Sequence, residues 1–157
     1  MDVRINSDEG IFKYRVAGLI VKDNKVLTVN ICNNGFFCLP GGHIHLGENS
    51  NVAMRREIGE EVGITCKEIK LIALTENFFQ SKKGRMHEVC YTYLIEPNEE
   101  MSTEDYEIVE NDEGIMKPLQ FKWCDIDTLD TIDFRPKILI EKLKNRTFEF
   151  EHFIVGD

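Results

Sequence analysis

Apolar and polar positions alternate along the first part of the chain, a spacing that predicts β-strands. One strand is expected over Lys13–Val21, and the dipeptide Asp23-Asn24 predicts a tight turn into a second strand over Lys25–Asn30. A short strand is expected at Phe36–Leu39. Pro40-Gly41-Gly42 is expected to stop it, because proline lacks an amide donor and glycine reaches backbone angles closed to other residues.

The remaining pattern predicts more strands than helices. Strands are expected at Lys67–Phe79, Met86–Glu96, Phe121–Cys124 and, in an aromatic tail, within Thr147–Val155. A short helical turn is expected near Asp125–Leu129, and a helix over Arg135–Lys144 with Pro136 in its first turn. Asn98–Asp112 is acidic and poor in apolar side chains, so a surface loop is expected there.

Because the predicted helices are separated by strands, an α/β fold with a mixed β-sheet between helices is expected. The length of 157 residues fits one domain, over 1–157, and 42% hydrophobic residues can fill a single core. The aromatic tail around Phe148–Phe153 has two interpretations: it forms a core strand, or it forms a contact in a homodimer.

A helix is predicted over Asn51–Val62. Asn49 and its two successors offer side-chain oxygens that can cap its first turn, and Gly63 stands where a left-handed residue would end it. Val52, Ile58 and Val62 are expected to form its apolar face.

The same helix carries a cluster of carboxylates. Glu57, Glu60 and Glu61 stand at positions i, i+3 and i+4, which lie on one side of a helix. Like charges at this spacing repel one another, and Arg56 is the only cation in the six-residue run Arg56–Glu61. A hard divalent cation, Mg²⁺ or Mn²⁺, would relieve the repulsion, since such ions prefer carboxylate and water oxygens. The alternative is an ordinary solvated acidic face.

The segment from Gly42 to Ile64 resembles the Nudix box, which is written Gly-x5-Glu-x7-Arg-Glu-(apolar)-x-Glu-Glu-x-Gly-(apolar). Every defined position is filled, with Glu48 as the first glutamate and Arg56-Glu57 as the central pair. Leu39-Pro40-Gly41 before the segment and Trp123 after it are also similar to the family. The resemblance implies a Nudix-type α/β/α sandwich and the Mg²⁺-dependent hydrolysis of a phosphoanhydride in a nucleoside diphosphate-linked substrate.

The resemblance also implies roles for the residues of the box. Glu57, Glu60 and Glu61 would bind the metal, and Gly41 would let a backbone oxygen approach it. Arg56 would orient the glutamates. Glu48 would contact a metal ligand or a metal-bound water rather than the metal itself. The general base is expected to be Glu60 or Glu61, or else a distal residue. Glu113 and Glu88 are the distal candidates, and an ordinary strand residue facing water is the competing interpretation of Glu88.

Substrate preference lies outside the box, where the sequence is less informative. Phe78 could stack on a base, and Arg15 and Arg85 could meet phosphates; a core ring and solvated cations are the competing interpretations. The expected substrate is a nucleoside triphosphate, and oxidised and non-standard triphosphates are included in this expectation. The alternatives are an ADP-ribose or other nucleotide-sugar pyrophosphatase, a non-catalytic nucleotide sensor, and an isomerase acting on isoprenoid diphosphates.

The net charge of −9 argues against a surface for long nucleic acids, which need clustered Lys and Arg. No apolar run reaches membrane-spanning length, and the first residues lack the basic-then-apolar pattern of a signal peptide. The sequence therefore predicts a cytoplasmic protein with a small-molecule nucleotide as partner. Five cysteines without a Cys-x-x-Cys pair are expected to be reduced structural thiols.

Overall fold

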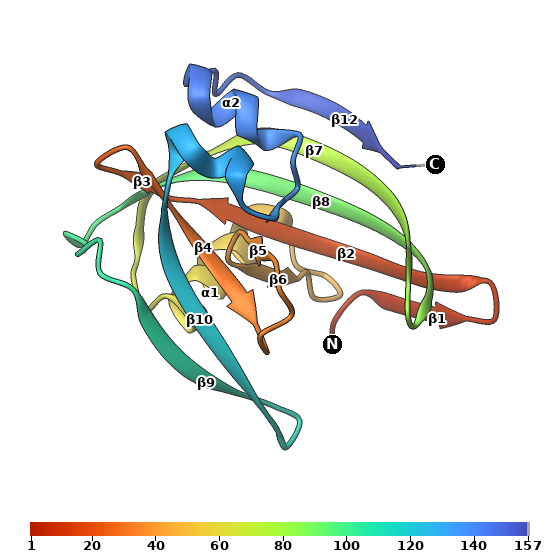
Figure 1. Cartoon of the computed structure of the whole chain (residues 1–157). Coiled ribbons are helices and arrows are strands. Elements are labelled where there is room, and N and C mark those ends of the chain that lie inside the picture. Colours follow the sequence, from red (N-terminus) through yellow and green to blue (C-terminus); the bar gives the residue numbers. More distant parts are fainter. Residues whose placement is uncertain (157) are drawn as a thin grey trace. The chain divides into compact units, whose positions relative to one another are not determined.

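The computed structural model describes residues 1–156, which form two compact units (Figure 1). The first unit comprises Met1–Gly18, Gly41–Glu99 and 149–156, and the second comprises Leu19–Pro40 and Glu100–Phe148. Each unit is built around its own six-stranded sheet. The predicted mixed α/β class is confirmed, because both sheets combine parallel and antiparallel pairs and the helices are few.

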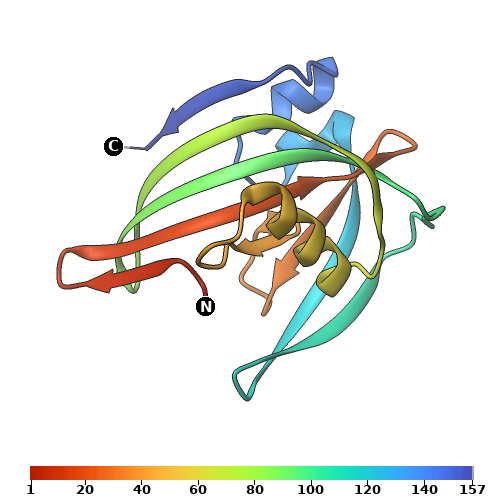
Figure 2. The ribbon, with the colours of Figure 1, turned by 180° about the vertical axis from the view of Figure 1, so that it is seen from behind.

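The sheet of the first unit has the order β1-β2-β8-β7-β12, with β6 paired to β2. Its strands are β1 (Arg4–Ser7), β2 (Gly10–Leu19), β6 (Gly41–His43), β7 (Cys66–Ser81), β8 (Gly84–Pro97) and β12 (Glu151–Val155). β12 runs parallel to β7, whereas β1 and β6 each pair antiparallel with β2, and β7 pairs antiparallel with β8. Helix α1 (Ser50–Glu61) lies across one face of this sheet (Figure 2). A Cβ atom at Gly18 of β2 would touch Met54 and Ile58 of α1, so the helix packs closely on that strand.

The sheet of the second unit has the order β11-β5-β4-β10-β9, with β3 paired to β4. Its strands are β3 (Val21–Lys22), β4 (Lys25–Ile31), β5 (Phe37–Cys38), β9 (Tyr106–Asp112), β10 (Ile115–Asp125) and β11 (Phe134–Arg135). A 3₁₀ helix, η1 (Ile126–Thr131), and the short helix α2 (Leu139–Asn145) follow β10. The predicted hairpin is confirmed: Asp23 and Asn24 both have positive φ, as a two-residue turn between twisted strands requires.

The surface loop predicted over Asn98–Asp112 is wrong in its second half. Tyr106–Asp112 forms β9, which pairs along its whole length with β10. The ring of Tyr106 stacks on Phe121 at a centroid distance of 4.7 Å. β9 is an edge strand, and edge strands tolerate acidic side chains on their solvent side, so its composition resembles that of a loop.

Two element boundaries also differ from the prediction. Pro40 ends the short strand as expected, but Gly41 and Gly42 begin β6 and pair with Ala17 and Val16 of β2. The helix expected over Arg135–Lys144 is shorter and begins at Leu139, because Arg135 pairs with β5 and 136–138 form a turn.

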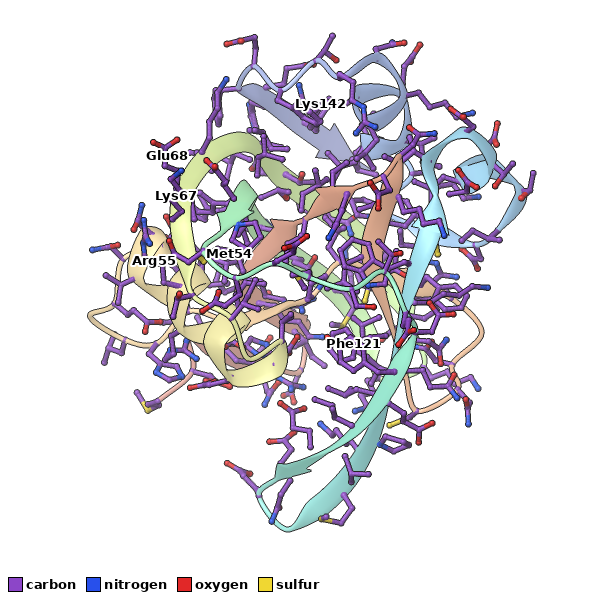
Figure 3. All side chains as sticks on the ribbon, turned by 90° about the vertical axis from the view of Figure 1, so that its left-hand side faces the viewer. Met54, Arg55, Lys67, Glu68, Phe121 and Lys142 are labelled. Carbon is purple, nitrogen blue, oxygen red and sulfur yellow. The ribbon has the colours of Figure 1, made fainter. Side chains whose placement is uncertain are left out.

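The buried face of α1 differs from the predicted one. Ala53, Met54 and Ile58 are fully buried, whereas the side chain of Val52 is exposed. The side chain of Arg55 lies on the outer side of α1, near Lys67 and Glu68 at the start of β7 (Figure 3). The burial of 53, 54, 57 and 58 places Glu57 on the inner face, so this carboxylate is held inside the first unit while Glu60 is exposed.

Candidate functional site

Helix α1 has caps at both ends that fix where its glutamates lie. The Asn49 side chain accepts a hydrogen bond from Val52 N at 3.0 Å, as predicted for an N-cap. At the other end Gly63 has φ +76° and its amide donates to the Ile58 carbonyl at 3.1 Å. A side chain at Gly63 would strain this left-handed turn, so the sequence itself determines both ends of the helix.

Arg56 binds three glutamates and one backbone carbonyl. Its Nε and Nη2 donate to the two carboxylate oxygens of Glu48, each at 2.8 Å, which is a bidentate ion pair. Its Nη1 donates to Glu57 Oε1 at 2.8 Å and to Glu60 Oε2 at 3.3 Å. Its Nη2 also donates to the His43 carbonyl at 3.0 Å, which ties the helix to β6. Only a planar guanidinium presents donors in this fixed fork, so lysine would keep the charge but could not make all of these hydrogen bonds.

Glu48 is held as a carboxylate by this fork. The hydrogen bonds from Arg56 lower the pKa of Glu48 to about 2, and the His45 amide adds a further hydrogen bond at 3.2 Å. The same contacts raise the pKa of Arg56 above its ordinary value. Glu48 therefore orients Arg56 and stays charged throughout the neutral range.

Glu57 is buried against the backbone of β6. Its side chain is 11% exposed, and a Cβ atom added to Gly42 would lie 2.4 Å from its carboxylate. The glycine thus leaves the space that the carboxylate fills. Burial raises the pKa of Glu57, and Arg56 opposes that shift.

Glu61 points toward the same short strand, whereas Glu60 faces solvent. The Gly41 amide donates to Glu61 Oε2 at 3.3 Å, and the Glu60 side chain is 61% exposed. Within residues 1–156, no three His, Cys, Asp or Glu side chains are already gathered at metal-holding distances. The donor set nevertheless fits a hard divalent cation, since carboxylates of Glu57 and Glu61 both border the Gly41–Gly42 backbone and Glu60 is on the adjacent turn.

The predicted distal residues fall in different places. Glu88 of β8 forms an ion pair with Arg15 of β2 at 3.5 Å and is 15% exposed, so it does not simply face water. Arg15 of β2 pairs in register with His43 of β6. His43 follows Gly42, the residue against which the Glu57 carboxylate packs. Glu113 is exposed at the turn between β9 and β10, in the second unit.

The two other predicted substrate-binding residues share a hollow in the first unit. Phe78 and Arg85 both line a cavity of about 290 Å³ formed by the β1–β2 turn and the far end of β7 and β8. Phe12 and His87 also line it. Sequence reasoning missed these two residues, although Phe12 continues the alternation of Tyr14 and Val16 on one side of β2.

The pKa of Glu48 predicts a stability that depends on pH. Its folded pKa of about 2 is below the ordinary 4.5, so the unfolded chain binds more protons between these values. The stabilisation is fully present above about pH 4.5 and is lost as the pH falls toward 2. Urea unfolding between pH 2 and 6 is expected to show a steeper fall for the parent than for Glu48→Gln. Equal slopes in the two proteins would contradict the assigned ion pair.

Comparison with known proteins identifies the family of this chain. The NUDIX domain family matches residues 12–143. The chain is 34% identical over 84 residues to an ADP-ribose pyrophosphatase of Methanocaldococcus jannaschii, which covers 52% of this chain and 48% of that protein. It is 35% identical over 63 residues to a MutT-like protein of Streptomyces ambofaciens, covering 40% of this chain and 41% of that protein. The chain thus spans about half the length of these curated relatives, or less.

Solved structures show the same fold. The mutator MutT protein of Bacillus halodurans matches with a TM-score of 0.66 and 17% identity, over 91% of this chain and 89% of that one. This is a mixed α/β fold in which α1 carries the Arg56-Glu57 pair, Glu60 and Glu61 of the Gly42–Ile64 segment. The chain belongs to the Nudix domain family. Within the described part of the chain, no helix is both long and apolar enough to cross a membrane.

Proposed function

We propose that this protein is a Mg²⁺- or Mn²⁺-dependent Nudix hydrolase that cleaves a phosphoanhydride bond in a nucleoside diphosphate-linked substrate. The single observation that carries the proposal is the cluster in which Arg56 holds Glu48, Glu57 and Glu60 together and binds the His43 carbonyl of β6, with Glu57 against Gly42. The family, and the relative named as an ADP-ribose pyrophosphatase, support a pyrophosphohydrolase. The proposal treats 1–157 as one hydrolase domain with a small-molecule substrate in the cytoplasm.

Nudix domains generally use a divalent metal ion, and the proposed ligands here are Glu57, Glu60, Glu61 and the Gly41 backbone. Such an ion, when bound, neutralises phosphate charge and lowers the pKa of a bound water. Arg56 would position the ligands, because it donates hydrogen bonds to Glu57 and Glu60 while Glu48 holds its guanidinium through two hydrogen bonds.

Glu60 is the better placed acceptor for the proton of the attacking water. Its side chain is 61% exposed, whereas Glu57 is buried; Glu60 and Glu61 each accept one hydrogen bond at 3.3 Å, from Arg56 and from the Gly41 amide. A general base must be within hydrogen-bond reach of the proton that it takes, so a solvent-accessible carboxylate is the first one to test. Glu61 remains the alternative base.

A nucleoside triphosphate is the proposed substrate, and ADP-ribose is the second candidate. The ADP-ribose pyrophosphatase of Methanocaldococcus jannaschii, at 34% identity, is the observation that favours the second. Both substrates place a diphosphate next to a nucleoside, so the same glutamates would serve either reaction.

A substrate panel tests the proposal. Phosphate or nucleotide release from nucleoside triphosphates, oxidised triphosphates, ADP-ribose and nucleotide sugars is measured with Mg²⁺ and with Mn²⁺. We expect one substrate class to be hydrolysed at least tenfold faster by the parent than by Glu60→Gln or Glu61→Gln. Tight nucleotide binding without turnover in the parent would instead favour a sensor and overturn the proposal.

A further inference from the structure

The hollow in the first unit lies on the same side of β2 as the glutamate cluster. Residues two apart in a strand point to the same side, so Phe12, Tyr14, Val16 and Gly18 share one face. Gly18 of this face meets α1, and Val16 pairs with Gly42, where the Glu57 carboxylate lies. Phe12 is four residues from Val16, or about 13 Å at roughly 3.3 Å per residue. A separation of this size allows one extended ligand to contact both places.

The rings of the hollow form an ordered aromatic stack. Phe78 stacks on His87 at a centroid distance of 4.5 Å and an angle of 29°, and Phe12 meets the edge of His87 at 5.3 Å and 84°. None of these rings is buried: Phe12 and Phe78 are half-buried and His87 is exposed. A stack that is ordered but open to solvent can accept another flat ring, which would bury aromatic surface on binding.

The size and rim of the hollow also suit a heterocyclic base. Its volume of about 290 Å³ lies near the lower limit of ligand sites, roughly 300–1,000 Å³. It is therefore matched to one ring system rather than to a whole nucleotide. Arg85, Glu9 and Ser7 line it and supply donors and acceptors, which a purely apolar ligand could not use.

Two hydroxyl groups lie between the hollow and the glutamates. Tyr14 Oη donates to Tyr91 Oη at 3.3 Å, and their rings meet edge to face at 5.7 Å. The hydrogen bond with Tyr91, together with burial, raises the pKa of Tyr14 to about 12. Tyr14 therefore stays protonated near neutral pH, so this stretch of the face offers uncharged polar groups of the kind that a sugar binds.

We infer that the hollow lined by Phe12, Phe78 and His87 holds the aromatic base of the substrate while its phosphates lie beside Gly41 and Gly42. The inference rests on the proposed function and adds the nucleoside-binding half of the site to it. Tyr14 and Tyr91 then face the sugar, and Arg85 contacts a polar edge of the base. The chain thereby prefers nucleotides to pyrophosphates that lack a base.

Phe78→Leu tests the inference, with Phe79→Leu as the matched control. Phe79 is the next residue of β7 and points to the opposite side of the strand. Titration calorimetry measures binding of AMP and GMP, and of ribose 5-phosphate, which has no base. Phe78→Leu is expected to weaken binding of the nucleoside monophosphates roughly fivefold to a hundredfold, the usual effect of removing one ring from a base stack. Ribose 5-phosphate binding is expected to stay the same in all three proteins.

The same variants separate failure of this inference from failure of the proposed function. With a hydrolysed substrate, Phe78→Leu should raise KM by a similar factor while kcat stays within about twofold of the parent, and Phe78→Tyr should restore KM. Equal KM and equal monophosphate binding in Phe78→Leu and Phe79→Leu would overturn the inference and leave the hydrolase proposal intact. If no substrate is hydrolysed, the comparison of monophosphate binding still decides whether the hollow binds a base. His87→Leu, at an exposed position, repeats the test should Phe78→Leu fail to fold.

Discussion

Replacing Arg56 with alanine is expected to lower kcat/KM by about 100-fold and to destabilise the fold. The guanidinium donates to Glu48, Glu57 and Glu60, so its loss leaves three neighbouring carboxylates without their shared partner. Removing a residue that orients metal ligands commonly costs about 10- to 100-fold in activity or metal affinity. Breaking one side of a largely buried ion pair costs roughly 3–5 kcal/mol, and the lower end applies here because Arg56 is partly exposed.

The pH profile distinguishes this electrostatic effect from simple loss of structure. Burial already raises the pKa of Glu57, and the hydrogen bond and positive charge of Arg56 lower it. Without Arg56, protonation of Glu57 should occur at higher pH, so the acid limb of the rate profile should move upward in pH. Arg56→Lys keeps the charge but loses the fork, and we expect it to recover only part of the activity.

Arg55→Ala is the matched control for Arg56→Ala. Arg55 is the neighbouring residue on the outer side of α1, where it bonds to Asn51 and the Cys66 carbonyl. Its removal should leave kcat/KM within about twofold of the parent. Similar losses in the two variants, with an unchanged acid limb in Arg56→Ala, would show that Arg56 does not organise the glutamates.

Replacing Gly42 with alanine is expected to lower kcat by about 100-fold with little change in secondary structure. The added Cβ would lie 2.4 Å from both Glu57 Oε1 and the carboxylate carbon, which no real contact allows. Because the clash is with the end of a side chain, Glu57 can shift while the strand stays in place. Misplacing a catalytic group by about 1 Å can cost on the order of 100-fold in rate. Steady-state kinetics and circular dichroism together measure the effect.

Two other glycines of the box region serve as controls for Gly42→Ala. A Cβ at Gly41 would lie 2.1 Å from the Val16 carbonyl, so Gly41→Ala should disturb the pairing of β6 with β2 and lower stability. Gly59 lies in α1 with no close neighbour, and Gly59→Ala should stabilise the helix by about 1 kcal/mol. Full activity in Gly42→Ala would show that the position of the Glu57 carboxylate does not matter for the reaction.

Local patterns predicted the helix, its ends and its acid cluster. Asn49 and Gly63 act within a few residues of the helix they bound, so their effect can be recognised in the sequence. The turn at Asp23-Asn24 is of the same kind, because the backbone angles it needs depend on the residues of the turn. The box added the expectation that Arg56 orients its neighbours, which the hydrogen bonds of Arg56 support.

Non-local packing decided the features that the sequence did not predict. β9 forms because its residues pair with β10 and Tyr106 stacks on Phe121, although the acidic segment itself lacks a strand-like composition. Val52 is exposed and Glu57 is buried because the direction in which α1 meets β2 and β6 selects its inner face, and periodicity alone leaves that rotation open.

By itself, the sequence of this protein determined the family, the acidic helix and the capping residues, because each depends on residues close together in the chain. The tertiary structure decided which carboxylate is buried against Gly42, and it brought Phe12, Phe78 and His87 around one hollow. The physical reason is that strand register and helix packing join residues far apart in the chain, such as Phe12 and His87, which are 75 positions apart, and no local pattern encodes such contacts.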